Sequence, residues 1–387
     1  MNDKIWNWRI LCIFLGLTFF IQINFNYEVG DSEYLIKLHN YPFEKHTFLT
    51  EDGYRMTIFR IPGRRFAPSL NGQKSEKPPL ILQHGILGSS DVFLVNGINS
   101  PAFYFADQGY DVWLTNVRGN SYVRENINME TSNPSFWNFS FEEIGLFDSK
   151  AHISYILTQT TQEKIDFVGY SQGSLQILAA LSLDPFFSEK ISSVALWAPA
   201  LRMDLSNSPL VHLGYYTNIW KILRFTMGEE LLPSINVINS LYGTLCDWAP
   251  FVCELDMYLT SDSSFDTVNI PQLAEFKAHS MRGMSAQGLE TLYTMYGREQ
   301  FGNNKGKYKV GNIRGVRIGV FFGQEDRLGN KQNVEVFVND MKLGGGEVHF
   351  QGEYPHMGHV SFLIPKQERR QYLYDTLQLF KSKDLKN

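Results

Sequence analysis

Short apolar runs alternate with segments of helical periodicity along most of the chain, and this alternation predicts an α/β protein. Runs that are apolar throughout predict strands buried on both faces, which is typical of parallel sheets. The predicted strands lie within 78–85, 110–119, 165–168, 191–198, 316–322 and 347–351. The predicted helices lie at 102–109, 141–158, 172–183 and 368–383. The fold class is therefore α/β, with a mostly parallel sheet flanked by helices.

Two segments depart from this rhythm. Residues 46–62 alternate in the manner of a β-hairpin, with a turn at Glu51–Gly53. Residues 204–310 lack strand periodicity and are rich in Trp, Tyr, Phe, Leu and Met, which predicts an inserted, mainly helical cap or lid. The alternative is that these apolar residues are ordinary core. With the cap, the core of the fold comprises 26–203 and 311–387.

The N-terminal 25 residues have the pattern of a secretory signal peptide. Lys4 and Arg9 precede the apolar run Ile10–Ile21, which is shorter than the roughly 20 residues that a bilayer span needs. No small-residue cleavage site follows, so an uncleaved membrane anchor is the alternative. Both interpretations, a signal peptide and a membrane anchor, predict that the chain enters the secretory pathway.

Composition narrows the functional classes. The 387 residues are 43% hydrophobic, 14% aromatic and 19% charged, with a net charge of −5. The chain has no long basic block, so we expect no nucleic-acid partner, whereas the aromatic content suits an apolar ligand.

The predicted secretory compartment permits two modifications, a disulfide and a glycan. Cys246 and Cys253 are the two of the three cysteines that lie outside the signal peptide. They can form a disulfide in an oxidising compartment or remain buried free thiols. Asn138 carries the single N-x-S/T sequon, in the aromatic run FWNFSF, so it is either glycosylated or buried without a glycan.

The stretch Gly169-Tyr170-Ser171-Gln172-Gly173 is G-x-S-x-G between a predicted strand and a predicted helix. In this context the pattern is the nucleophile elbow, in which a strained turn exposes the serine at the carboxyl edge of the sheet. Ser171 is therefore the candidate nucleophile. A serine hydroxyl needs a base to react, and the elbow predicts the chain order Ser, acid, His.

The acid and the base are sought after the last predicted strands. Asp326 follows the strand at 316–322, and its short side chain suits that loop better than Glu325; Asp204 is a distant second choice. His356 and His359 both follow the final strand, and either can reach the strand ends.

An oxyanion hole should complete the site. Its expected donors are the backbone N–H of Gln172 and that of Ile86, in the loop after the strand at 78–85. His84 is expected to organise that loop. Fixed dipoles handle the charge in this chemistry, so we expect no metal or organic cofactor.

Several motifs, in order over about 46–380, resemble those of the acid lipase family, which includes the gastric and lysosomal lipases and related steryl ester hydrolases. They are TEDGY, LQHGILGSS, GYDVWLTNVRGN, FWNFSFEE, GYSQG, GQEDRL and GHVSF. The last of these resembles the family's x-HLDF and favours His359 over His356. Val360-Ser361 replaces the usual Leu-Asp of that motif, and Gln324 stands where glycine is common.

The resemblance implies an α/β-hydrolase core with a helical cap, and hydrolysis of triacylglycerols or steryl esters in lysosomes or secretions. The expected partner is a neutral-lipid substrate at a lipid–water interface, with peripheral contact to a membrane or lipid droplet. The alternatives are an esterase or thioesterase for soluble short-chain substrates, a non-catalytic lipid-binding protein on the same scaffold and a membrane-anchored interaction protein. The sequence favours no particular oligomeric state.

Overall fold

The computed structural model describes residues 29–68, 70 and 73–382. The predicted signal peptide lies outside these residues and stays a prediction. Within the described part of the chain, no helix combines the length and apolarity needed to cross a membrane.

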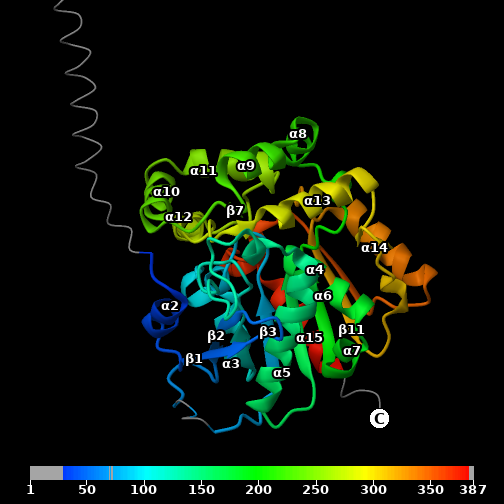
Figure 1. Cartoon of the computed structure of the whole chain (residues 1–387). Helices are drawn as coiled ribbons and strands as arrows, with labels where there is room; N and C mark the ends of the chain where they lie inside the picture. Colours follow the sequence, from blue (N-terminus) through cyan, green and yellow to red (C-terminus); the bar gives the residue numbers. More distant parts are fainter. Residues whose placement is uncertain (1–28, 69, 71–72, 383–387) are drawn as a thin grey trace, which may run out of the picture.

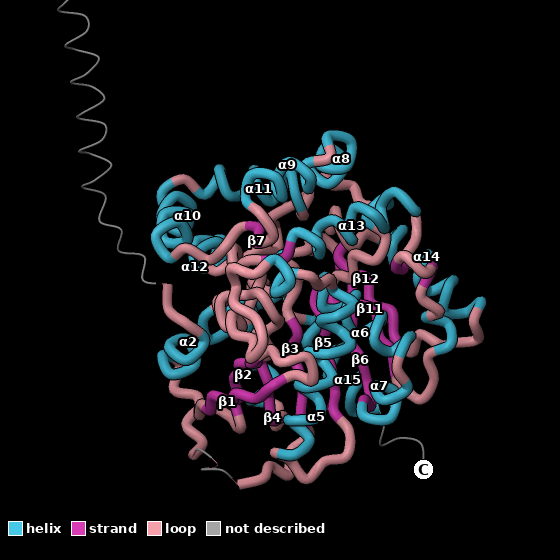
Figure 2. The backbone as a smooth tube through the Cα atoms, in the orientation of Figure 1, coloured by secondary structure: helices cyan, strands magenta, loops and turns pink. Residues whose placement is uncertain are grey.

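A single eight-stranded sheet runs through the molecule (Figure 2). Its strand order is β1-β2-β4-β3-β5-β6-β11-β12. The first two pairings, β1 with β2 and β2 with β4, are antiparallel, and the other five are parallel. The strands are β1 (Glu44–Leu49), β2 (Arg55–Ile61), β3 (Pro79–Gln83), β4 (Asp111–Leu114), β5 (Ile165–Tyr170), β6 (Ile191–Trp197), β11 (Arg317–Gly323) and β12 (Phe350–Tyr354). The predicted mostly parallel sheet is confirmed.

The two faces of the sheet build two separate hydrophobic layers. Side chains alternate between faces along a strand, so Leu80 and Leu82 of β3 enter one layer and Ile81 enters the other. The Leu80 layer also contains side chains of α2 (Ser32–Leu38), α3 (Pro101–Asp107) and α15 (Gln371–Lys381). The Ile81 layer contains side chains of α4 (Phe141–Glu143), α5 (Lys150–Thr158), α6 (Gln172–Leu183), α7 (Pro185–Lys190) and α14 (Lys331–Leu343).

Two predicted elements differ from the structure in detail. The last strand was expected at 347–351, but β12 begins at Phe350, because its ladder with β11 pairs Gly319 with Phe350 and Gly323 with Tyr354. The predicted helix at 141–158 contains a π-helical segment, Ile144–Ser149, between α4 and α5. There Gly145 lies close to the backbone of α6, and any added Cβ would come within 2.3 Å of the Gln176 carbonyl.

Between β6 and β11 the chain forms helices that lie above one end of the sheet (Figure 1). We call these the cap helices: α8 (Pro209–Thr217), α9 (Ile219–Met227), α10 (Asn236–Trp248), α11 (Pro250–Thr260), α12 (Leu273–Ala278) and α13 (Ala286–Arg298). Short strand pairs, β7 (Glu230–Leu231) with β8 (Met284–Ser285) and β9 (Gly302–Asn303) with β10 (Gly306–Lys307), lie in the same part of the chain. Cys246 of α10 and Cys253 of α11 form a disulfide, with their Cα atoms 5.6 Å apart.

Backbone hydrogen bonds join the segment that carries the cap helices to loops that follow the parallel strands. The N–H of Arg282 donates to the carbonyl of Leu87 after β3, at 3.0 Å, and the N–H of Ser263 donates to that of Glu325 after β11, at 2.9 Å. The cap therefore lies against the edge of the sheet at which the predicted site residues occur.

Candidate active site

The turn between β5 and α6 holds Ser171 in a strained conformation. Its φ of 53° and ψ of −117° lie outside the regions that L-residues ordinarily adopt. The turn is tight because α6 begins at the next residue, and a Cβ added at Gly173 would lie 2.5 Å from the Gln83 carbonyl of β3. Ser171 is thereby held at the N-terminus of α6, as the elbow predicts.

A hydrogen-bonded chain of three side chains starts at this serine. The Oγ of Ser171 lies 2.9 Å from Nε2 of His359, and Nδ1 of the same ring lies 2.9 Å from Oδ2 of Asp326. His359 comes from the segment after β12 and Asp326 from the loop after β11. The backbone N–H groups of Leu328 and Gly329 each donate to Oδ1 of Asp326 at 2.8 Å, which fixes the carboxylate.

Burial and charge set the protonation of the ring. All three side chains are buried. Burial alone would lower the pKa of His359, but the charge of Asp326 and the hydrogen bond to it raise that pKa above its ordinary value. The imidazole is therefore a stronger base than a free histidine, as a group that receives a proton from a serine should be.

The two expected oxyanion donors lie next to the serine. Gln172 is the first residue of α6, where a backbone N–H has no partner within its helix. Ile86, Gln172 and Ser171 all line one cavity of about 300 Å³. The remaining lining is almost wholly apolar and comes mainly from the cap and neighbouring loops: Leu87, Leu175, Ala200, Met203, Ser208, Leu210, Val211, Thr260, Leu289, Leu292, Tyr293 and Leu328.

Comparison with known proteins identifies the family of the chain. The family model described as a partial alpha/beta-hydrolase lipase region matches residues 32–97, and that described as alpha/beta hydrolase fold matches 78–216. Lipase member J of Homo sapiens is 32% identical over 260 residues, which is 66% of this chain and 70% of that protein. The chain belongs to the acid lipase family.

Other comparisons give the extent of the likeness. Gastric triacylglycerol lipase of Mus musculus is 31% identical over 260 residues, and the match spans 66% of this chain but only 64% of that relative. The human protein of the same name is 26% identical over 348 residues, or 85% of each chain. A solved esterase from Thermogutta terrifontis has a TM-score of 0.53 at 13% identity, covering 88% of this chain and 98% of that one, and supports the fold alone.

Two of the acid lipase motifs meet in an ion cluster around the buried Arg118. Arg118, of GYDVWLTNVRGN, binds Asp52, of TEDGY, through Nη1 at 2.6 Å and Nη2 at 2.9 Å. Its Nε binds Asp148 in the π-helical segment at 2.8 Å. Burial alone would lower the pKa of Arg118, but the two carboxylates raise it well above its usual range. This cluster joins the hairpin, the loop after β4 and the helix that packs on α6, so these motifs support the elbow without touching it.

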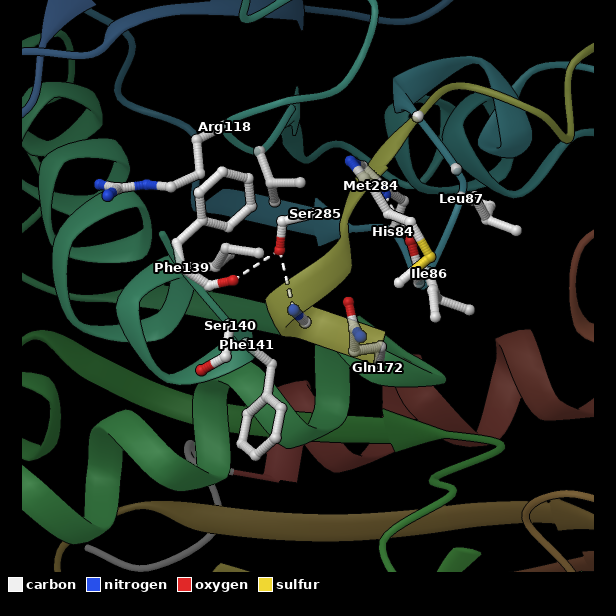
Figure 3. A pocket seen from close by; sticks show the side chains of 16 residues that line it. His84, Ile86, Leu87, Arg118, Phe139, Ser140, Phe141, Gln172, Met284 and Ser285 are labelled. Atoms are coloured by element: carbon white, nitrogen blue, oxygen red, sulfur yellow. Dashed lines mark hydrogen bonds between the residues drawn. The ribbon is translucent and has the colours of Figure 1, made fainter. Parts of the chain in front are cut away.

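A third acid lipase motif contacts the cap behind the oxyanion loop. A small cavity of about 30 Å³ lies there, between the loop that carries Ile86 and the segment FWNFSF. Figure 3 shows the side chains that line it. Ser285 joins FWNFSF to the start of α13: its Oγ donates to the Phe139 carbonyl at 2.6 Å and accepts from the N–H of Gly288 at 2.9 Å (Figure 3). The bridge fixes the start of α13 against the core.

The loop that carries Ile86 is held internally by His84. Its Nδ1 lies 2.8 Å from the Gly85 carbonyl, and Nε2 lies 3.2 Å from Nδ2 of Asn120. Burial lowers the pKa of His84 to about 4, so the ring stays neutral. These contacts agree with the expected role of His84 as a loop organiser.

A buried ionic group ties the same loop to the cap, and sequence reasoning missed it. Asp91 binds Nδ1 of His279 at 3.0 Å and Nη2 of Arg282 at 2.9 Å, with all three side chains buried. The hydroxyl groups of Ser32 and Tyr122 also donate to Asp91, each at 2.6 Å. Nothing local in the sequence signals this group, because 188 residues separate Asp91 from His279.

The residues considered as alternatives for the acid and the base do not contact Ser171: two of them have other partners and one is exposed. The carboxylate of Glu325 accepts from Oγ of Ser263 at 2.5 Å, and Asp204 forms an ion pair with Arg202 at 2.6 Å. His356 is exposed. Asn138 is also exposed, at the end of a short 3-10 helix, so the side chain that the sequon requires faces solvent.

Proposed function

We propose that this protein is a serine lipase, a carboxylic ester hydrolase that releases fatty acids from neutral lipids. The observation that carries the proposal is the chain of hydrogen bonds from Asp326 through His359 to Ser171, because Ser171 lines an apolar cavity. The names of the relatives, lipases and a triacylglycerol lipase, support the same class.

The geometry supports acyl transfer in two steps. Nε2 of His359 takes the proton of the Ser171 hydroxyl as its oxygen attacks the ester carbonyl. Asp326 accepts a hydrogen bond from Nδ1 of His359, which keeps the proton of the neutral imidazole on Nδ1, and it stabilises the imidazolium. The negative charge on the carbonyl oxygen develops near the backbone N–H groups of Ile86 and Gln172. His359 then protonates the leaving alcohol, and water repeats the sequence on the acyl-enzyme to release the fatty acid.

The cavity supports a long acyl chain as the acid half of the ester. Leu175, Leu292 and Leu328 are among the apolar side chains that line it next to Ser171. Burying an acyl chain there gains about 0.8 kcal/mol for each methylene group removed from water. We propose triacylglycerol as the first substrate to test, with steryl ester as the second.

The outer surface of the cap helices supports contact with a lipid surface. Many of the large hydrophobic side chains that are exposed in the described structure belong to residues 210–258. The most exposed is Phe225 of α9, at 91%, and Trp248 of α10 and Phe251 of α11 are 65% and 69% exposed. Soluble proteins rarely expose many such side chains together unless they bind a partner. The proposed partner is the surface of a lipid droplet, emulsion or membrane.

A substrate panel tests the proposal. We expect the purified protein to hydrolyse emulsified long-chain triacylglycerol or steryl ester faster than a soluble short-chain ester at equal ester concentration. Hydrolysis of the soluble ester alone would favour the alternative function, an esterase or thioesterase for soluble short-chain substrates. A folded protein that binds the emulsion, cleaves no ester and resists a fluorophosphonate would be a non-catalytic lipid binder.

Polar substitutions on the cap should affect emulsified substrate selectively. We expect the triple variant Phe225→Ser, Trp248→Ser, Phe251→Ser to lose about tenfold or more of its activity on emulsions, because each buried aromatic ring contributes roughly 1.5–3 kcal/mol to surface binding at most. Its activity on a soluble ester should stay near the wild-type value. The matched control, Leu343→Ser with Phe66→Ser, removes side chains that are 87% and 73% exposed but lie outside the cap. Equal losses in the two variants, or equal losses on both substrates, would contradict a docking role for the cap.

A further inference from the structure

A second carboxylate lies beside the proposed catalytic histidine, and it comes from the part of the chain that carries the cap helices. Asp262 follows α11 and is fully buried. Its backbone forms an isolated antiparallel bridge with Asp326. The two acidic residues therefore reach the same place from different segments, one with the cap and one from the core sheet.

The carboxylate of Asp262 contacts the backbone on both sides of His359. On one side, the N–H of Val360 donates to its Oδ1 at 3.2 Å. On the other side, a Cβ added at Gly358 would lie 1.9 Å from Oδ1, so only glycine leaves room for the carboxylate. The Oγ of Ser261 donates to Oδ2 at 2.6 Å. These contacts hold Asp262 against the turn that presents the imidazole.

The charged neighbours of Asp262 couple its ionisation to that of His359. Burial raises the pKa of Asp262 to about 7, the bond from Ser261 and the attraction of His359 oppose this rise, and the charge of Asp326 adds to it. In turn, the charge of Asp262 adds to that of Asp326 in raising the pKa of His359. The pKa of Tyr170, whose ring packs against the imidazole, is raised by burial and by both carboxylates.

The other charged groups of the loop that carries Asp326 have partners of their own. Glu325 binds Ser263, and Arg327 donates to the Asn207 carbonyl and lies over the ring of Tyr258. Among the described residues, the charged groups that act on Asp262 are therefore His359 and Asp326, and the neutral Tyr170 is the other titratable neighbour.

We propose that Asp262 is a positioning residue of the proposed serine hydrolase, which holds the backbone on both sides of His359 and places a second negative charge beside the imidazolium. The inference rests on the proposed function. It also gives the cap a role in the chemistry, because this carboxylate reaches the histidine only when the segment after α11 is seated on the core.

The charge has a definite effect on pH dependence. An ionised Asp262 stabilises protonated His359, so it raises the pH at which the imidazole becomes the neutral base that catalysis requires. Removing that charge should lower this pH. Asp262→Asn keeps an oxygen that can accept from Val360 and Ser261 but carries no charge, which makes it the variant of choice.

The experiment is the pH profile of kcat/KM on a soluble short-chain ester, whose acidic limb reports the free enzyme. For Asp262→Asn we expect the acidic limb to move down by at least about half a pH unit. The matched control is Glu325→Gln, which removes a charge from the residue next to Asp326, in the loop after β11. This variant should leave the acidic limb in place. An unmoved limb in Asp262→Asn, or an equal shift in Glu325→Gln, would overturn the proposal.

A measurement on the wild-type protein covers the case in which Asp262→Asn does not fold. We expect the ring nitrogen resonances of His359, assigned with His359→Gln, to titrate in two steps, because a coupled pair loses its protons in two macroscopic steps. A single-step titration would overturn the proposal. Failure of the proposed function is seen separately, as ester cleavage that survives the loss of the Ser171 hydroxyl.

Discussion

Replacing Ser171 with alanine should lower kcat for ester hydrolysis by about 10⁶-fold and leave the protein folded. The hydroxyl oxygen is the atom that forms the acyl-enzyme, and neither His359 nor the oxyanion donors can supply a covalent nucleophile in its place. Alanine keeps the Cβ and loses only the Oγ, whose hydrogen bond in the structure is to His359. The strained turn is set by the backbone around it, so the melting temperature should change little.

The measurement is turnover of a soluble ester and of an emulsion, together with labelling by a fluorophosphonate. Wild-type protein should be labelled at Ser171, and Ser171→Ala should not be labelled. Ser182→Ala is the matched control, because Ser182 lies in α6, the helix that Ser171 precedes, and its hydroxyl donates to the Leu178 carbonyl at 2.7 Å. Wild-type turnover in Ser171→Ala, or equal losses in both variants, would refute the serine mechanism.

Asp326→Asn should lower kcat by about 10⁴-fold. Oδ1 of Asp326 accepts from the N–H groups of Leu328 and Gly329, so the single oxygen of an asparagine will occupy that position. The amide NH₂ must then face Nδ1 of His359, where the carboxylate now accepts. Nδ1 becomes the acceptor, the ring proton moves to Nε2, and that nitrogen can no longer take the proton of Ser171.

Asp204→Asn is the control for this substitution. Asp204 follows β6, the other position considered for the acid, and its carboxylate pairs with Arg202. We expect kcat within about twofold of the wild-type value for this variant, since the pair does not touch the triad. A loss in Asp204→Asn as large as that in Asp326→Asn, with both proteins folded, would mean that the acid has been misassigned.

The sheet could be predicted from local pattern because each parallel strand is a short run of apolar residues between helical segments. The elbow was predictable for the same reason: strand, turn and helix all lie within about twenty residues. Residue-level register was less predictable. The final strand lies at Phe350–Tyr354 and not at 347–351, because pairing with β11 decides which residues of a weakly patterned segment join the ladder.

The sequence by itself determined the chemical inventory and its order: a serine in G-x-S-x-G, an acid after a later strand and a histidine after the last. The resemblance of GHVSF to the family motif favours His359 over His356, and the structure places His359 beside Ser171. Only the tertiary structure brought Asp262 beside His359 and Asp91 against His279. The physical reason is the separation along the sequence of the residues that meet. Periodicity reports which face of a strand or helix is buried, but a contact across 188 residues depends on how the sheet, its loops and the cap pack together.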